Sequence, residues 1–481
     1  MSKLYIFGIG GTGSRVLKSL TMLLASGVEC GVDTIVPIII DRDMSNKDLS
    51  RTKLLIEDYV AVNKIAETNG KNQFFKTKIE LLNNDLCLQL KDNTQKFGEF
   101  IGKNSMSKEN KALVEMLFSD EMLNMDMTAG FQGNPNIGSI VLNQFDNSDI
   151  FKAFANDFKD GDKIFIVSSI FGGTGASGFP LLRKVLQTKN QKDAQSNDLA
   201  NWGMVNKAQI GAISVLPYFN VKSAEDDSLV DSDTFIDKAK AALSYYKTED
   251  KKIDTLYYIA DNRSSTYEHH KGGDAQKNNA HFVELAAAMS ILDFINSEKA
   301  NIHRDAEGNI EKTTYKEFGI ARDTAEINFT TLEDETQKLL VNPLSRFLLF
   351  RNYMQYIYAR ERKYQPYSKK YKFDQQFRSN NVIKKLESVQ ATFYEWLQEL
   401  EKQSRKFSPF NLFTTHAFDF VKGDINVTSG KGRFSDWARV DDQLNRQSGK
   451  IKLEHLEKQT KEKHFMELFY CAISELLSFK N

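Results

Sequence analysis

Two glycine-rich stretches of the chain have the composition of phosphate-binding loops. GIGGTG at 8–13 follows the apolar run KLYIF, and FGGTG at 171–175 follows the apolar run KIFIVSS. An amphipathic segment comes after each stretch, so both have the pattern of a strand, a tight loop and a helix. Glycines let backbone N–H groups approach phosphate oxygens at the positive end of a helix, and the Thr174 hydroxyl can add a donor. The sequence therefore predicts two phosphate-sized loops.

The first loop by itself is compatible with several functions. It fits the GxGxxG pattern of a dinucleotide-binding Rossmann loop, of an adenylating enzyme of the ThiF type and of a tubulin-type nucleotide loop. A tight turn without a ligand is the remaining alternative.

Two acids after the second apolar run bear on this choice. Asp41 and Asp43 follow TIVPIII (34–40), where a carboxylate can accept hydrogen bonds from ribose hydroxyls. Together with Arg51 they also resemble the acids and arginine of ThiF-like enzymes, but Asn46 stands two positions early and the later cysteine pairs of those enzymes are missing. A charged loop that caps the strand is the alternative.

The second loop resembles a glycine loop of the tubulin/FtsZ superfamily, whose members bind one nucleotide with two such loops. FGGTGASG (171–178) is similar to the family signature GGGTGSG, with Phe171 in place of its first glycine. Three later segments resemble the family in the same order: IGAISVLPYF (210–219), DTLYYIADNRSS (254–265) and NNAHFVELAAAMSILDFI (278–295). Between the loops, GFQGNPNIG (130–138) resembles the FtsZ segment GAGANPEVG, with matches at Gly130, Gly133, Asn134, Pro135 and Gly138. The chain therefore resembles a divergent bacterial tubulin-like branch.

The resemblance implies a site for GTP or GDP with Mg²⁺, without dedicated metal-ligand residues. The residues that it places on the phosphates are Gly10, Gly11, Thr12 and Gly13 on one side, Gly172, Gly173, Thr174, Gly175 and Ser177 on the other, and Gly133 and Asn134 over the γ-phosphate. Asp261 stands where the family reads the guanine edge, and a carboxylate suits the adjacent N–H donors of guanine. Asn278 or Asn279 holds the second base-reading position. The alternative for Asp261 is a helix N-cap.

Some family features are absent, and they concern turnover. The family's GxxNxD loop after the central helix, which orients the attacking water for the neighbouring subunit, is not present. Asp305 and Glu307 lie in this region, but their spacing does not select either as a substitute, so the catalytic residues are unknown. The sequence thus predicts nucleotide binding with slow or absent hydrolysis. It also predicts self-assembly into oligomers or filaments, or docking of a partner in a nucleotide-dependent way; a nucleotide-locked scaffold is the alternative.

The elements that must position these residues are those of an α/β domain. Near-continuous apolar runs at 3–7, 34–40, 163–169, 209–217 and 255–260 predict a parallel sheet covered on both faces. We expect a nucleotide-binding domain over 1–300, with a mostly helical insertion at about 51–125 and a central helix at about 276–296. A mainly helical domain over 301–481 follows, and the apolar stripe of its clearest helix (380–407) is interpreted as core.

Composition sets the class of protein. The chain has 481 residues, with 64 Lys and Arg against 64 Asp and Glu, so no overall field recruits nucleic acid or an anionic membrane. Three scattered cysteines indicate neither a disulfide framework nor a metal site. No apolar run approaches the roughly 20 residues that span a bilayer. We expect a soluble, cytoplasmic protein.

One basic and aromatic segment could contact a partner. YARERKYQPYSKKYKFDQQFR (358–378) alternates Lys and Arg with Tyr and Phe, a composition that can hold single-stranded nucleic acid or an anionic membrane. Because the chain is neutral overall, we favour a solvated linker or a protein-docking surface on the helical domain.

Overall fold

The computed structural model describes residues 2–66, 74–90, 95–188, 199–222, 234–248, 252–263, 265–268, 273, 277–297, 302–318, 324–360, 365–423, 436–450, 460–477 and 479. Its strands are β1 (Lys3–Ile9), β2 (Thr34–Ile40), β3 (Lys78–Ile79), β4 (Lys163–Ser169), β5 (Gln209–Val215), β6 (Phe219–Lys222), β7 (Thr255–Ile259), β8 (Ser265–Glu268), β9 (His303–Arg304), β10 (Ile310–Lys312), β11 (Thr314–Phe318), β12 (Glu326–Ile327) and β13 (Lys406–Phe407). Its helices are α1 (Gly10–Ser26), α2 (Lys47–Ala66), α3 (Phe97–Phe100), α4 (Lys108–Leu117), α5 (Asp120–Leu123), α6 (Pro135–Leu142), α7 (Asp149–Asp157), α8 (Gly173–Leu186), α9 (Trp202–Val205), α10 (Phe235–Thr248), α11 (Phe282–Asn296), α12 (Asp334–Tyr356), α13 (Pro366–Tyr371), α14 (Gln375–Arg378), α15 (Asn381–Glu401), α16 (Asp436–Lys450) and α18 (Lys461–Leu476).

The main sheet has seven parallel strands in the order β11-β7-β5-β4-β1-β2-β3. Its five inner strands are the five apolar runs from which the sequence predicts strands, and they are almost wholly buried. Both faces carry helices, so a strand has no water-facing side that would call for polar residues. The predicted α/β class with a parallel sheet is confirmed.

The strand order reverses between β1 and β4. From β1 the chain moves outward to β2 and β3, and it then returns to place β4 on the other side of β1. The two strands run in register, with Gly8 opposite Val167 and Ile9 opposite Ser168. Loops that are far apart in the chain therefore leave the sheet side by side. A reversal of this kind opens a crevice at the carboxyl ends of parallel strands.

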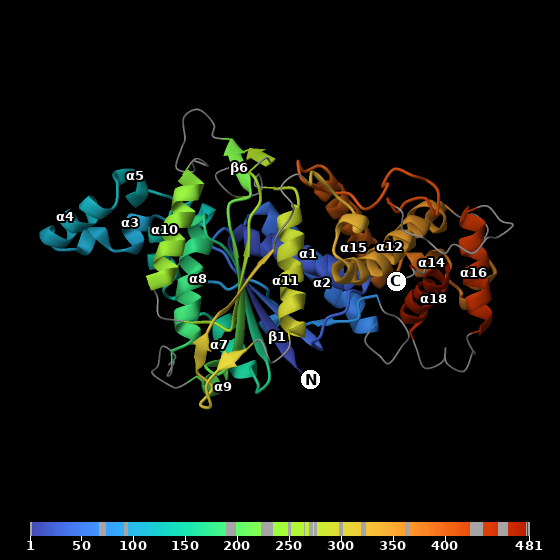
Figure 1. Ribbon diagram of the computed structural model, residues 1–481, viewed down its shortest axis with the longest axis horizontal. Coiled ribbons are helices and arrows are strands. Elements are labelled where there is room, and N and C mark those ends of the chain that lie inside the picture. Colours follow the sequence, from blue (N-terminus) through green and yellow to red (C-terminus); the bar gives the residue numbers. More distant parts are fainter. Residues whose placement is uncertain are drawn as a thin grey trace.

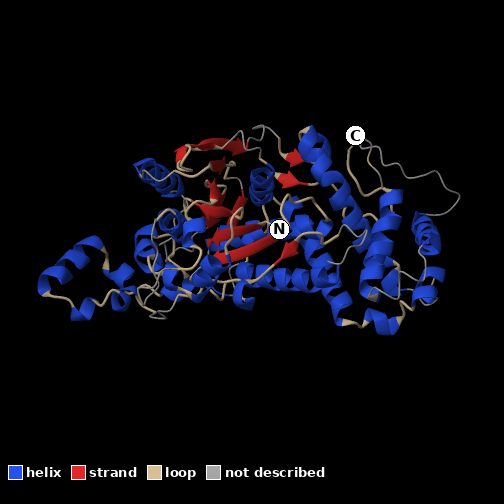
Figure 2. Ribbon diagram, turned by 90° about the horizontal axis from the view of Figure 1, so that it is seen from below, coloured by secondary structure: helices blue, strands red, loops and turns tan. Residues whose placement is uncertain are grey.

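Helices cover the sheet as two layers (Figures 1 and 2). One layer contains α8 and α10, and α6 packs against α8. The other contains α1, which contacts both α2 and α11. Helix α1 begins directly after β1, and three residues separate the end of β4 from the start of α8. The first residues of both helices therefore lie at the carboxyl ends of neighbouring strands, on opposite faces of the sheet.

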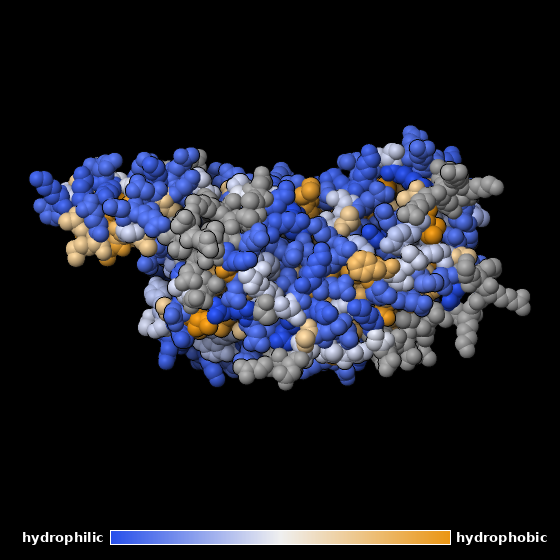
Figure 3. Space-filling view, turned by 90° about the horizontal axis from the view of Figure 1, so that it is seen from above, coloured by the Kyte–Doolittle hydropathy of each residue, from blue (hydrophilic) through white to orange (hydrophobic). Residues whose placement is uncertain are grey.

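The predicted helical insertion contributes more than helices. It supplies the edge strand β3, and α3, α4 and α5 form an arm that extends from one end of the molecule (Figures 1 and 2). The arm exposes Leu113, Met116 and Leu117 of α4, at 55%, 84% and 64%. Figure 3 shows apolar side chains gathered on one side of the arm.

Two predicted boundaries differ from the structure. Strand β11 (Thr314–Phe318) pairs with β7, so the sheet continues past the boundary expected at residue 300. The central helix was expected from about residue 276, which lies outside the described residues, but α11 begins at Phe282. It begins there because His281 and Glu284 form a capping box: the His281 ring accepts the N–H of Val283, and the Glu284 carboxylate accepts the N–H of His281.

The part that follows β11 is mainly helical, as expected. The apolar stripe of α15 is buried at Leu386, Val389, Phe393, Trp396 and Leu400, which confirms its interpretation as core. Helix α15 packs against α2, so the helical region rests on the layer that contains α1 and α2. None of the helices in the described part of the chain is long and apolar enough to cross a membrane.

The basic and aromatic segment 358–378 is largely folded. Residues 361–364, which include Tyr364, lie outside the described residues. The other five aromatic side chains are buried, at Tyr358, Tyr367, Tyr371, Phe373 and Phe377. Buried rings cannot stack on bases, so the described residues of this segment do not form a platform for single-stranded nucleic acid.

Candidate functional site

A cavity of about 200 Å³ lies at the carboxyl ends of the strands, where the sheet order reverses. It brings together eleven of the sixteen residues predicted to bind nucleotide: Gly10, Gly11, Thr12, Asp41, Asp43, Gly133, Gly172, Gly173, Thr174, Gly175 and Asn278. The other five, Gly13, Asn134, Ser177, Asp261 and Asn279, do not line it. Both glycine loops and the segment between them therefore border one space.

The first loop presents the start of α1 to the cavity. Gly10 has φ +70°, a left-handed conformation that favours glycine, and the helix begins there without a side-chain cap. The first turn of α1 contains no acid. The first N–H groups of a helix have no partner within it, so they remain available to a ligand and carry the positive end of the helix dipole.

The second loop presents the start of α8 in the same way. Gly172 precedes the helix, makes no side-chain cap, and is followed by a first turn without acids. The loops approach closely, because a Cβ added at Gly10 would lie only 3.3 Å from the Cβ of Thr174. Two uncapped helix starts thus face one cavity from two directions, an arrangement suited to an anion with several oxygens.

Three predicted residues support the loops from behind. Gly13 packs on the preceding strand, where an added Cβ would lie 2.4 Å from the carbonyl carbon of Gly8. The Ser177 hydroxyl donates to the carbonyl of Gly173 at 2.7 Å. The Asn134 side chain caps α6 by accepting the N–H of Asn136 and of Ile137. Gly13, Ser177 and Asn134 thus stabilise the loops around the cavity without lining it themselves.

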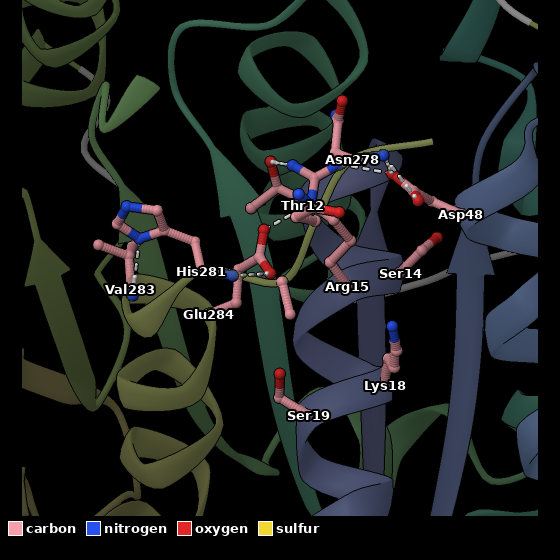
Figure 4. A network of polar contacts seen from close by, with 12 residues as sticks. Thr12, Ser14, Arg15, Lys18, Ser19, Asp48, Asn278, His281, Val283 and Glu284 are labelled. Carbon is pink, nitrogen blue, oxygen red and sulfur yellow. Dashed lines mark hydrogen bonds and ion pairs between the residues drawn. The ribbon is translucent and has the colours of Figure 1, made fainter. Parts of the chain in front are cut away.

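A buried arginine that the sequence reasoning missed ties the first loop to three other elements (Figure 4). Arg15 lines the cavity, its Nε donates to Glu284 at 2.5 Å, and its Nη1 donates to Asp48 at 3.2 Å. Its Nη2 donates to the hydroxyls of Tyr218 at 3.0 Å and of Thr12 at 3.4 Å. Among the described residues that line the cavity, Arg15 is the one with a cationic side chain. Its guanidinium is already paired with the carboxylates of Glu284 and Asp48. Uncharged donors, among them the backbone N–H groups of the two helix starts, are therefore what the cavity offers a ligand.

The network extends to Asn278 and to helix α15. Asp48 accepts the N–H of Asn278 at 3.1 Å, while the Asn278 side chain points away from Asp48 (Figure 4). Farther from the cavity, Glu399 of α15 accepts Lys18 at 2.9 Å and pairs with Arg51. Burial lowers the pKa of Lys18. Charged groups thus run without interruption from the first loop into the helical region.

Asp41 and Asp43 face the cavity from the end of β2. The Asp43 carboxylate accepts the N–H and hydroxyl of Ser45 and the N–H of Gly273. Asp41 is buried and accepts the N–H of Asp43 at 3.2 Å. Burial raises the pKa of Asp41 to about 7. A hydroxyl donor or a cation beside Asp41 would stabilise its carboxylate.

Asp261 is engaged elsewhere. Arg405, which follows α15, donates from Nε to both carboxylate oxygens of Asp261, at 2.8 and 2.9 Å. The Asp261 side chain is 4% exposed and does not line the cavity. The described structure therefore does not bring this acid to the place where the sequence prediction put it, because an arginine remote in sequence takes both oxygens. Asn279 contributes its carbonyl, which accepts the Tyr267 hydroxyl at 3.0 Å.

An aromatic wall completes the cavity and was also missed. Phe171, Phe219, Phe235 and Tyr267 line it together with Val221. Phe219 is central: its ring centroid is 5.5 Å from that of Phe171 and 5.1 Å from that of Tyr267. The one sequence signal was Phe171, the position where the chain departs from the glycine of the family signature.

Comparisons with known proteins give limited information. No protein-family model matches the chain, and no curated protein matches it. Among solved structures it is similar to CetZ from Methanosaeta thermophila strain DSM 6194, with 14% identity and a TM-score of 0.29 over 62% of this chain and 56% of that one. It is also similar to CetZ2 from Haloferax volcanii in a GTPγS-bound protofilament, with 15% identity and a TM-score of 0.27 over 62% and 61%. Both matches span less than two thirds of the other chain, and values of this size do not establish a family.

Proposed function

We propose that this chain is a tubulin/FtsZ-like nucleotide-binding protein that binds GTP or GDP with Mg²⁺. The observation that carries the proposal is the convergence of two uncapped, glycine-rich helix starts on one cavity at the reversal point of a parallel sheet. A triphosphate needs many donors within a few ångströms, and two helix starts provide them without buried lysines. A protein that holds its ligand's phosphates with a single loop would not need a second glycine-rich loop at the same cavity.

The lining groups fit this ligand. Gly10, Gly11 and Thr12 would hold the phosphates from one side and Gly172 to Gly175 from the other, with Gly133 near the terminal phosphate. Asp41 and Asp43 would accept ribose hydroxyls or hold Mg²⁺. The described residues contain no cluster of three or more metal-ligating side chains, and Mg²⁺ commonly uses one or two carboxylates plus phosphate oxygens. When bound, Mg²⁺ would neutralise phosphate charge.

The adenylating alternative receives less support from the site. It would need Arg51 beside the nucleotide with Asp41 and Asp43. Arg51 instead pairs with Glu399 and Glu395 of α15 and does not line the cavity. We therefore retain the two-loop proposal.

Slow turnover forms part of the proposal. Asp305 and Glu307 lie in the β9–β10 hairpin, whose Arg304 pairs with Asp254 just before β7. The hairpin thus lies at the amino ends of the strands, whereas the cavity lies at their carboxyl ends. The hairpin therefore cannot orient water in the cavity of its own chain. A nucleotide held without an attacking group would act as a lasting structural part, so we propose a cytoplasmic protein that self-assembles or docks a partner on its helical region. We also propose to move the domain boundary from residue 300 to just after Phe318.

The test is calorimetric titration of GTP with Mg²⁺ into the full chain and into Gly173→Val and Gly11→Val variants. A Cβ at Gly173 would lie 3.0 Å from the Asn134 nitrogen, whereas one at Gly11 would meet only Arg15 at 3.4 Å, so Gly11→Val is the gentler change. We expect each to weaken binding at least about tenfold, or 1.4 kcal/mol. Gly449→Ala is the control, since its Cβ would meet nothing. Normal GTP binding by both folded valine variants would refute the two-loop site.

A further inference from the structure

The segment 277–280, just before α11, has no regular secondary structure, and it borders the cavity through Asn278. Its peptide groups take part in no helix or sheet, so they need partners from other elements. Asp48 of α2 accepts the N–H of Asn278 at 3.1 Å. The carbonyl of Asn279 accepts the hydroxyl of Tyr267, on β8, at 3.0 Å. The segment is therefore held from outside, by residues that are far from it in the sequence.

Ala280 receives both of its backbone partners from the helical region. The carboxylate of Glu399, in the last turn of α15, accepts its N–H at 3.0 Å. The side chain of Gln403, just beyond α15, donates to its carbonyl at 2.9 Å. All three residues are buried, so water does not readily replace either bond. Lys277 adds an exposed pair with Glu395 of α15, at 3.1 Å.

The two side chains that hold Ala280 are themselves fixed. Lys18 of α1 donates to the Glu399 oxygen that accepts the Ala280 N–H, at 2.9 Å, and Arg51 of α2 pairs with the other oxygen. Gln403 also donates to the Tyr267 hydroxyl at 3.3 Å. A segment that is fixed before its ligand arrives loses less entropy on binding.

We propose that Glu399 and Gln403 are positioning residues of the cavity, which hold Ala280 by its N–H and its carbonyl and thereby place Asn278 beside the ligand. Neither side chain lines the cavity, so its effect on a ligand passes through the segment that it holds. The inference rests on the proposed nucleotide-binding function and adds that the helical region is part of the binding site. A partner that displaced α15 would therefore change the affinity for nucleotide, and nucleotide would change the affinity for that partner by the same factor.

The experiment measures the dissociation constant of GTP with Mg²⁺, by calorimetric titration of the full chain and of its Gln403→Leu variant. Leucine has a similar size but leaves the Ala280 carbonyl without its donor. We expect the affinity to fall at least about fivefold. Thermal melting confirms that each variant is folded at the temperature of the titration.

Gln390→Leu is the matched control. Gln390 is also buried in α15, and its side-chain nitrogen has no hydrogen-bond partner among the described residues. The control makes the same chemical change in the same helix, and it should keep the parental affinity. An equal loss of affinity in both variants would mean that any buried change in α15 weakens binding, and it would overturn the positioning role.

A double variant separates positioning from a general loss of stability. In an Asn278→Ala background, Gln403→Leu should weaken GTP binding no further, because the side chain that it places is gone. The same loss in both backgrounds would show that Gln403 acts by another route and would overturn the inference.

Glu399→Gln tests which property of Glu399 positions the segment. The amide oxygen can still accept the N–H of Ala280, so the affinity for GTP should stay at the parental value. The melting temperature should fall, because Lys18 and Arg51 lose their charged partner. A loss of affinity as large as that of Gln403→Leu would remove Glu399 from the proposal.

The outcomes separate this inference from the proposed function. If the unmodified chain binds no GTP, the proposed function fails, and the positioning role fails with it. If the unmodified chain binds GTP and the folded Gln403→Leu variant binds it equally well, the positioning role alone is overturned.

Discussion

The two glycine loops have nearly the same sequence pattern but are held in place by different forces. The first is held from outside by charge, through Arg15 and its partners Glu284 and Asp48. The second is held by close packing: added Cβ atoms would lie 2.8 Å from Ile9 at Gly178 and 2.3 Å from the Ser177 hydroxyl at Gly138. A local pattern thus specifies the shape of a phosphate loop, but not what keeps it there. Deleting the Arg15 side chain should damage the first loop, which is also closely packed at Gly13, and adding a methyl group at Gly178 should damage the second.

The largest effect is expected from Arg15→Leu. The change leaves the carboxylates of Glu284 and Asp48 buried without their cation, and removing one partner of a buried ion pair typically costs about 3–5 kcal/mol of unfolding free energy. Urea denaturation of the nucleotide-free protein measures it. Arg446→Leu, which breaks an exposed pair with Asp442, is the control and should cost less than about 1 kcal/mol. Equal losses in the two variants would show that charge does not hold the first loop.

Gly178→Ala tests the packed loop. Its methyl group would lie 2.8 Å from Cγ2 of Ile9, and overpacking of this kind typically costs about 1–3 kcal/mol. Truncating Ile9 to Ala should relieve the clash, so the double variant should lose less than the sum of the two single losses. The same denaturation assay measures all three variants. Strict additivity would mean that Ile9 is not what limits the space at Gly178.

Asp41→Asn tests the electrostatics beside the first loop. Burial raises the Asp41 pKa from 3.8 to about 7, so between these values the folded chain binds more protons than the unfolded chain, and its stability falls as pH rises. Asparagine does not ionise, so the Asp41→Asn variant should not lose stability in this way as pH rises. Without nucleotide it should exceed the parent by at least about 1 kcal/mol at pH 8, and the difference should vanish below about pH 4. Asp160→Asn, an exposed acid, should show no such trend, and a pH-independent gain would contradict the assignment.

The smallest effect is expected for the turnover of GTP. Neither glycine loop supplies a group that would orient the attacking water, so hydrolysis should be slow. Phosphate cleavage needs the attacking water held in line, and positioning contributes several kcal/mol to the rate. We expect phosphate release from GTP to stay well below about one per second across a range of protein concentrations. A steep rise with concentration to that rate would show that a neighbouring chain completes a catalytic site.

Much of the fold was predictable because a strand that is buried on both faces is apolar along nearly its whole length, and such a run is visible in the sequence. The five apolar runs became the five inner strands, and the stripe of α15 became core. Elements with weaker signals were not anticipated: β11 is short and lies beyond the expected boundary, and α11 begins late because His281 and Glu284 cap it. In the site, the glycines were predicted from the composition of the two loops and from the family resemblance, and the structure brings most of them to one cavity. Arg15 and Tyr267 were missed, because a residue's partners across the fold leave no local pattern.

By itself, the sequence determined that strands of this kind end in loops that can face phosphate, because glycine content, apolar runs and helix starts are local properties of the chain. Tertiary structure decided that the loops meet, since only the return of β4 beside β1 puts Gly10 next to Thr174. It also decided which donor Asp261 meets. A carboxylate accepts from whichever donor the fold brings to it, and here that donor is Arg405, 144 residues away in the chain.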